Sequence, residues 1–200
     1  MTRISRAASR RPGGIEWATL LITALLVPAV ILAHELGHYL AGLAFNVPHP
    51  RLGLSGFSHG PAPWLSRRQV AMIGVAGPAV SLALAAIGLA RVKPGHARFA
   101  AALGVAACMR LCELLPFAVA ALARLARRAP YRRTTFDEPR VFDALGLNGD
   151  IALVGASVIF AAILFAVLRR QRRGSGKSLI IGGLIGWGAW RIMLEQGLLA

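Results

Sequence analysis

Long apolar segments recur along the 200-residue chain, and they constrain its fold more than any other feature. A run of about 18 or more apolar residues is long enough to cross a bilayer as a helix. Helices are the expected spanning elements because lipid offers no partner for an unpaired backbone N–H or C=O group. We therefore predict an all-α, polytopic integral membrane protein. About five transmembrane helices are expected, near residues 15–45, 70–90, 99–125, 151–168 and 179–199, or four if the glycine-rich last segment is re-entrant.

The composition agrees with a membrane protein. Hydrophobic residues make up 56% of the chain and charged residues 16%, and the mean hydropathy is +0.60. The net charge of +15 comes from Arg and Lys that lie mostly between the apolar segments, which is typical of topology-setting charges and of contact with anionic lipid headgroups. No aromatic and basic motif accompanies this charge, so we do not expect nucleic acid as a partner. Residues 1–14 are predicted to form a basic N-terminal tail, and residues 15–200 a transmembrane domain.

A HExxH motif lies inside the first apolar segment, as His34, Glu35 and His38 in the stretch ILAHELGHYLAG. Side chains four residues apart share one face of a helix, so both imidazoles can reach the same ion. Zinc held in this way lowers the pKa of a bound water toward about 7 and polarises a carbonyl. Glu35 can take the proton of that water and pass it to the leaving amine. The motif predicts a hydrolytic site with one Zn²⁺ per chain.

The apolar setting of the motif strengthens this interpretation. Ionisable residues inside a membrane are costly and mark functional sites. Coordination to zinc would offset that cost. The simpler explanation is a chance cluster near the membrane surface that water or neighbouring helices satisfy. Cys108 and Cys112 have no zinc-finger spacing and form no disulfide framework, so we expect them to be small packing residues.

Two stretches resemble a known family. Residues 34–57, HELGHYLAGLAFNVPHPRLGLSGF, resemble the first active-site segment of the site-2 proteases, the intramembrane zinc metalloproteases of peptidase family M50. Residues 76–85, AGPAVSLALA, are similar to the family's Gly-Pro-x-x-Asn element. Gly77 and Pro78 match that element, whereas Ser81 stands in place of the asparagine. The resemblance implies a three-helix catalytic core, a zinc ion held by two His and one Asp, and substrates embedded in the membrane.

The third zinc ligand is not fixed by the HExxH motif, although a catalytic zinc site takes three protein ligands and keeps one position open. The family usually supplies an Asp shortly after an Asn-x-x-Pro. Here Glu113 stands in the Asn position and Pro116 matches, but no Asp follows closely. Asp137 is our first choice for the third ligand. It opens the stretch DEPRVFDALGL, which is typical of a short helix with Gly146 at its end; its simpler role is to cap that helix.

Three other acidic residues remain alternatives for the third ligand. Glu113 lies within the third apolar segment, but an ion pair with Arg110, three residues earlier, would explain both residues. Asp143 and Asp150 are further alternatives, and their simpler roles are solvent exposure and capping. The remaining histidines lack ligand spacing and are expected to lie in loops: His49, His59 and His96.

The gap between the first two apolar segments contains the alternating stretch RLGLSGF, which favours a short β-hairpin. An exposed strand edge there could hold an unwound substrate segment by β-addition, a hypothesis that substitutions at Leu52 and Leu54 would test.

Together, these features predict an intramembrane zinc metalloprotease in a prokaryotic plasma membrane, acting on membrane-embedded or membrane-proximal peptides. His34, His38 and Asp137 would hold the zinc, and Glu35 would assist the attack of zinc-bound water. The alternative is a degenerate, non-catalytic membrane scaffold or regulator that binds metal. The oligomeric state is left open.

Overall fold

The chain is described by a computed structural model over residues 14–53, 56–92, 98–134, 136–171 and 173–197, most of them helical. Nearly all of the predicted basic tail lies outside these residues, as do Leu54 and His96. In chain order the elements are α1 (Trp17–Ala44), β1 (Arg51–Gly53), β2 (Gly56–Ser58), α2 (Arg67–Arg91), α3 (Arg98–Cys108), α4 (Leu111–Ala126), α5 (Asp137–Ala144), α6 (Gly149–Arg169) and α7 (Arg173–Glu195).

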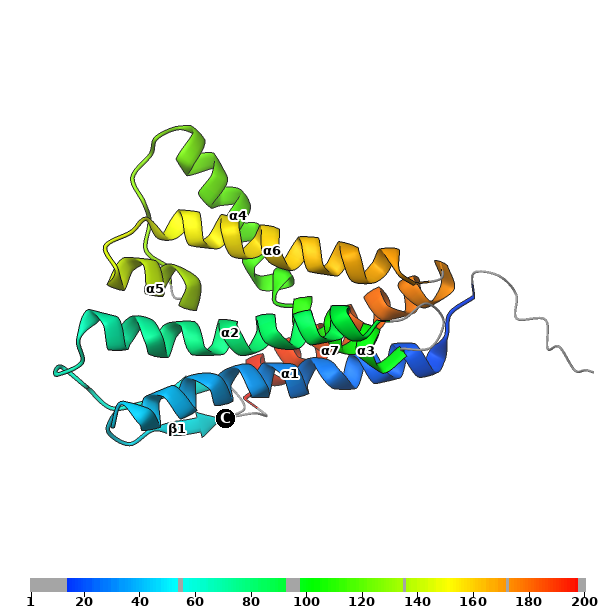
Figure 1. The fold of residues 1–200 in the computed structure, drawn as a ribbon, viewed down its shortest axis with the longest axis horizontal. Helices are drawn as coiled ribbons and strands as arrows, with labels where there is room; N and C mark the ends of the chain where they lie inside the picture. The colour runs from blue at the N-terminus through cyan, green and yellow to red at the C-terminus, as the bar shows by residue number, and fades with distance from the viewer. Residues whose placement is uncertain (1–13, 54–55, 93–97, 135, 172, 198–200) are drawn as a thin grey trace, which may run out of the picture.

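Three helices, α1, α2 and α6, are long and apolar enough to cross a membrane. The pair α3 and α4 passes the same test together, although it is bent by 41°. In Figure 1, α1, α2 and α6 run alongside one another and α4 leans away from them. The helical membrane fold is therefore confirmed, with three or four candidate spans in place of about five. The last predicted segment forms α7, which is not among them, since this helix begins at Arg173 and includes Lys177 and Arg191.

Helix α3 lies at the centre of the packing. Most of its residues are buried, and they form the main apolar cluster with side chains of α1, α2, α4 and α6. Gly88 of α2 and Gly104 of α3 meet backbone to backbone: a Cβ on Gly88 would come within 2.5 Å of Gly104. Small residues on the facing helices thus allow their backbones to approach closely.

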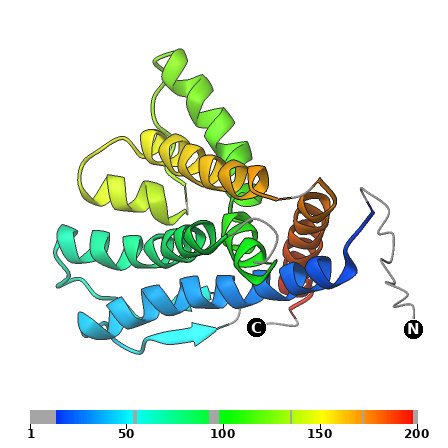
Figure 2. The same cartoon turned by 45° about the vertical axis from the view of Figure 1, so that its right-hand side comes forward.

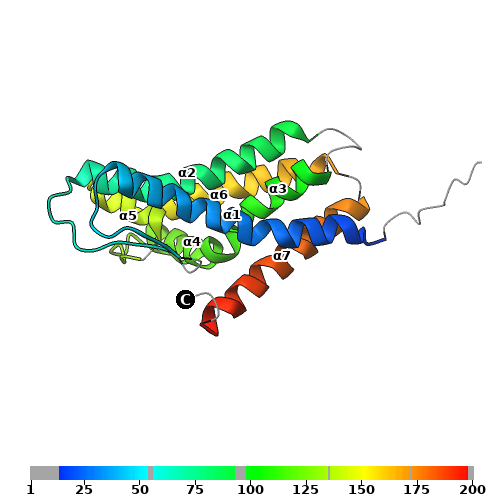
Figure 3. The ribbon, with the colours of Figure 1, turned by 90° about the horizontal axis from the view of Figure 1, so that it is seen from below.

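Helix α7 crosses α1 at an angle, as Figure 3 shows. The crossing depends on Gly182 and Gly186, because a Cβ at either position would collide with the α1 backbone at Leu20 or Ala24. These two glycines, four residues apart, therefore form the face of α7 that packs against α1. Residues in the C-terminal half of α7 line a cavity together with His34 and Glu35.

The predicted hairpin is present. Strands β1 and β2 pair antiparallel, with Leu52 opposite Phe57 and Gly53 opposite Gly56. The hairpin lies alongside the C-terminal part of α1 (Figure 1).

The short helix α5 packs between α2 and α6, which Figure 2 shows from the side. Its end has the predicted glycine: Gly146 has a φ of 76°, and Leu147 N–H donates to the Phe142 carbonyl at 2.7 Å. Such a left-handed residue closes a helix by satisfying its last carbonyls. At the other end, Phe136 occupies the N-cap position without a side-chain cap. The alternative role of Asp137 as an N-cap is therefore wrong, since Asp137 is the first helical residue.

Candidate metal centre

The HExxH residues lie on the inner face of α1. His34 and His38 are buried, with 3% and 5% of their surfaces exposed, and one helical turn separates them. Their Nε2 atoms are 3.2 Å apart. This arrangement follows directly from the four-residue spacing, which places the two imidazoles on one side of a helix.

Asp137 joins the two histidines from α5. Its Oδ2 atom lies 3.2 Å from His34 Nε2 and 3.3 Å from His38 Nε2, so the three atoms form a nearly equilateral triangle. A tetrahedral zinc site with bonds of about 2.0–2.1 Å places its ligand atoms roughly 3.3 Å apart. Two imidazole nitrogens and one carboxylate oxygen also match a ligand set that catalytic zinc uses. The three residues therefore fit a zinc ion with one position left open.

Gly77 of α2 leaves the space that such an ion needs. A Cβ at this position would collide with the Nε2 atoms of both His34 and His38. Any other residue would therefore fill the region in front of the two nitrogens. The glycine of the Gly-Pro element thus has a local steric role, and the structure gives a physical reason for it.

The Nδ1 atoms of both histidines also make polar contacts with α2. His38 Nδ1 donates to the Ile73 carbonyl at 2.7 Å, which leaves its Nε2 lone pair free for a metal. His34 Nδ1 lies 3.0 Å from Ser81 Oγ, a buried hydroxyl on α2. Ser81 stands where the site-2 proteases, which this stretch resembles, have asparagine. Its hydroxyl makes a polar contact with His34. Such outer contacts orient metal ligands.

The carboxyl group of Asp137 is held in its charged form. Burial raises its pKa, but the contacts with His34 and His38 and the charge of Arg110 together lower that pKa well below its usual range. A ligating carboxylate must be deprotonated, so this environment suits metal binding.

Glu35 is turned toward the hairpin. Its Oε2 atom accepts a hydrogen bond of 2.8 Å from the Phe57 backbone N–H. Because this N–H of β2 points to α1, the outer edge of β2 faces the HExxH motif. The carboxylate thus lies between the histidines and a strand edge.

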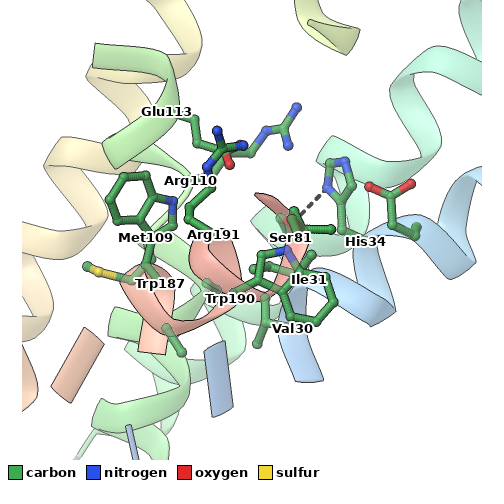
Figure 4. A pocket seen from close by; sticks show the side chains of 14 residues that line it. Val30, Ile31, His34, Ser81, Met109, Arg110, Glu113, Trp187, Trp190 and Arg191 are labelled. Carbon is green, nitrogen blue, oxygen red and sulfur yellow. Dashed lines mark hydrogen bonds between the residues drawn. The ribbon is translucent and has the colours of Figure 1, made fainter. Parts of the chain in front are cut away.

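A cavity of about 190 Å³ opens beside His34 and Glu35. Apolar side chains of α1, α3 and α7 form much of its wall, and Figure 4 shows His34 and Ser81 at one side with Met109 and Trp187 at the other. Its polar lining residues are His34, Glu35, Ser81, Arg110, Glu113 and Arg191. A peptide bond placed in this cavity would meet Glu35 and the first histidine.

The other acidic candidates lie elsewhere. Glu113 lines the cavity but is not part of the group of three. Asp143 accepts a hydrogen bond from Tyr131, and Asp150 is buried in an ion pair with Arg124. The described histidines outside the motif, His49 and His59, lie in the region around the hairpin, as expected.

The predicted ion pair between Arg110 and Glu113 is wrong. Arg110 is the N-cap residue of α4 and has helical φ and ψ, and Glu113 lies in the first turn of that helix, but these two side chains form no ion pair. The Arg110 guanidinium instead pairs with Asp137 and Glu138 of α5. Sequence reasoning missed Glu138. A signal was present, because a charged residue inside an apolar segment needs a buried partner.

Comparison with known proteins agrees with a metal site of this kind. No family model and no solved structure matches the chain. A protein of Synechocystis sp., named as a candidate zinc metalloprotease, is 40% identical over 79 residues. The matched region covers 36% of this chain and 20% of that protein, so the chain spans about a fifth of the length of this curated relative.

Proposed function

We propose that the chain is an intramembrane zinc metalloprotease of the site-2 protease type, family M50. The observation that carries the proposal is the triangle of His34, His38 and Asp137 at tetrahedral spacing, on and beside helices apolar enough to cross a membrane. The partial similarity to a protein named as a candidate zinc metalloprotease supports the same chemistry.

The chemistry assigns a separate task to Glu35. A zinc ion held by the three ligands would supply a Lewis acid that polarises the substrate carbonyl and acidifies water. Glu35 follows His34 and lines the same cavity, so its carboxylate accepts a proton from the attacking water molecule. The resulting carboxylic acid donates that proton to the amide nitrogen as the C–N bond breaks. Glu35 thus returns to its charged form at the end of each hydrolysis.

The substrate that fits this setting is a peptide segment in or next to the membrane. Its peptide bond must be unwound to be reached, and the hairpin beside Glu35 offers an exposed strand edge for β-addition. Replacing the exposed Leu52 of β1 by glutamate should disfavour an apolar peptide at the hairpin, lowering cleavage of such a peptide while zinc content stays at the wild-type value. Unchanged cleavage would contradict strand addition.

We propose a prokaryotic plasma membrane as the location, because the low Lys content and the high Arg and Ala content are typical of a GC-rich prokaryote. The exposed arginines that follow α4 suit contact with anionic headgroups: Arg127, Arg128, Arg132 and Arg133.

The decisive experiment measures zinc and cleavage on the same detergent-purified samples. Zinc per chain is measured by mass spectrometry, and cleavage is followed with a panel of fluorogenic peptides that contain one apolar span. Wild type should carry about one zinc, and Glu35→Gln should keep it while cleavage falls by roughly 10²–10⁴-fold. A wild-type protein that contains no zinc under metal-replete conditions would refute the proposal. Zinc-loaded wild type with no more cleavage than Glu35→Gln on any peptide would favour the non-catalytic scaffold.

A further inference from the structure

Arg110 is a largely buried charge at the break between α3 and α4. Its side chain is 14% exposed, and its neighbours Met109 and Leu111 belong to the apolar core. A buried guanidinium is costly unless it is paired and its N–H groups are hydrogen-bonded. The position of Arg110 therefore requires partners, and both come from the first turn of α5.

The guanidinium makes three hydrogen bonds with two carboxylates. Arg110 Nε and Nη2 donate to the two oxygens of Glu138 at 2.8 and 3.1 Å. Nη2 carries two hydrogens, and it also donates to Asp137 Oδ2 at 2.9 Å. Glu138 is itself buried, with 8% of its surface exposed. The two-point contact with Glu138 fixes the plane of the guanidinium, since a fork of this kind is directional.

The Asp137 oxygen that Arg110 contacts is the same Oδ2 that lies against both histidines. The backbone of α5 is located by packing on α2, where a Cβ on Gly74 would come within 2.9 Å of Val141. That packing does not determine the rotation of the Asp137 side chain. Arg110 supplies a directional contact that does.

We propose that Arg110 is a positioning residue for the metal centre. Glu138 anchors its guanidinium, and the Nη2 hydrogen bond turns Asp137 Oδ2 toward His34 and His38. The inference rests on the proposed zinc centre. It adds Arg110 and Glu138 to that centre as residues that raise zinc affinity without binding zinc themselves. Contacts of this kind change metal affinity by about 10–100-fold.

The chain contains a matched control. Arg124 of α4 also forms a two-point contact, with the buried Asp150 of α6, and this pair contains no metal-ligand candidate from the His34 group. Each arginine thus joins the α3–α4 segment to an acidic residue of a later helix. Replacement by lysine removes the fork in both cases but leaves the positive charge. Both substitutions break a two-point contact with a buried carboxylate, and only the Arg110 pair reaches the histidines.

The test measures the zinc dissociation constant of the full-length protein in detergent by competition with a chromophoric chelator. Arg110→Lys should bind zinc about 10–100-fold more weakly than wild type, whereas Arg124→Lys stays close to wild type. Circular dichroism and thermal unfolding of the zinc-free proteins should show similar helicity and similar losses of stability for both variants. A folded Arg110→Lys protein with the affinity of Arg124→Lys would overturn the inference.

Glu138→Gln provides a second variant if Arg110→Lys does not fold. It leaves Arg110 in place and removes the anchoring charge, so zinc affinity should fall while the apolar core is untouched. Wild-type affinity in folded Glu138→Gln would overturn the inference. If wild type itself binds no zinc, the proposed zinc centre fails as well. If wild type binds zinc and these variants bind it equally well, the zinc centre stands and only the role of Arg110 is refuted.

Discussion

The two regions that supply the metal-binding group differ in how the sequence encodes them. His34 and His38 come from α1, a continuous helix of 28 residues, and a four-residue spacing alone sets their separation. Asp137 comes from α5, a helix of 8 residues that reaches the histidines through packing on α2 and α6. The α1 half is therefore determined locally, and the α5 half depends on tertiary structure. Substitutions in the two halves should have different effects.

The largest expected effect comes from the α1 half. His34→Ala removes a ligand that no neighbour can replace, so zinc affinity should fall on the order of 10²–10³-fold, about a quarter of a typical binding free energy. The measurement is zinc competition with a chelator. His59→Ala is the control, because His59 lies outside the group. Equal zinc binding by the two variants would show that the α1 half does not hold the metal.

The α5 half should respond more moderately. Asp137→Asn keeps an oxygen at the same place but removes its charge, and we expect roughly 100-fold weaker zinc binding in the same assay. Asp143→Asn, in the same helix, tests whether the loss is a general effect on α5. If both asparagine variants retain wild-type affinity, another acidic residue must complete the site.

Gly77→Ala tests the space between the halves. The added methyl group would collide with the nitrogens of His34 and His38, so zinc affinity should fall about 10–100-fold in a folded protein. Gly155→Ala on α6 is the control, since a Cβ there meets nothing within 4 Å. Comparable zinc affinities would show that the imidazoles move aside freely.

Ser81→Ala should have the smallest effect. It removes the contact at His34 Nδ1 while the ring stays packed, and we expect about a 10-fold loss of zinc affinity. Ser157→Ala on α6 removes another buried hydroxyl, one without a hydrogen-bond partner in the described structure. A loss of the same size in both variants would point to general destabilisation instead of ligand orientation.

The sequence predicted the parts of the molecule that depend on short spacings. Hydropathy indicated the helical membrane fold, and the HExxH spacing indicated the buried histidine pair. Asp137 is 103 residues from His34, and no local pattern encodes that contact. It was the first choice among four acidic residues because it opens a stretch typical of a short helix, and that pattern carries no information on its distance from His34. The partner of Arg110 was predicted wrongly, because Glu113 is its neighbour in the same helical turn, whereas its actual partners Asp137 and Glu138 are 27 and 28 residues away.

The contact between Glu35 and the hairpin uses the backbone N–H of Phe57, not its side chain. Replacing Phe57 with any residue except proline leaves that donor in place. The Phe57 ring packs near His38 and Gly42, so a side-chain substitution there reports the loss of that packing and says little about how firmly the Glu35 carboxylate is held.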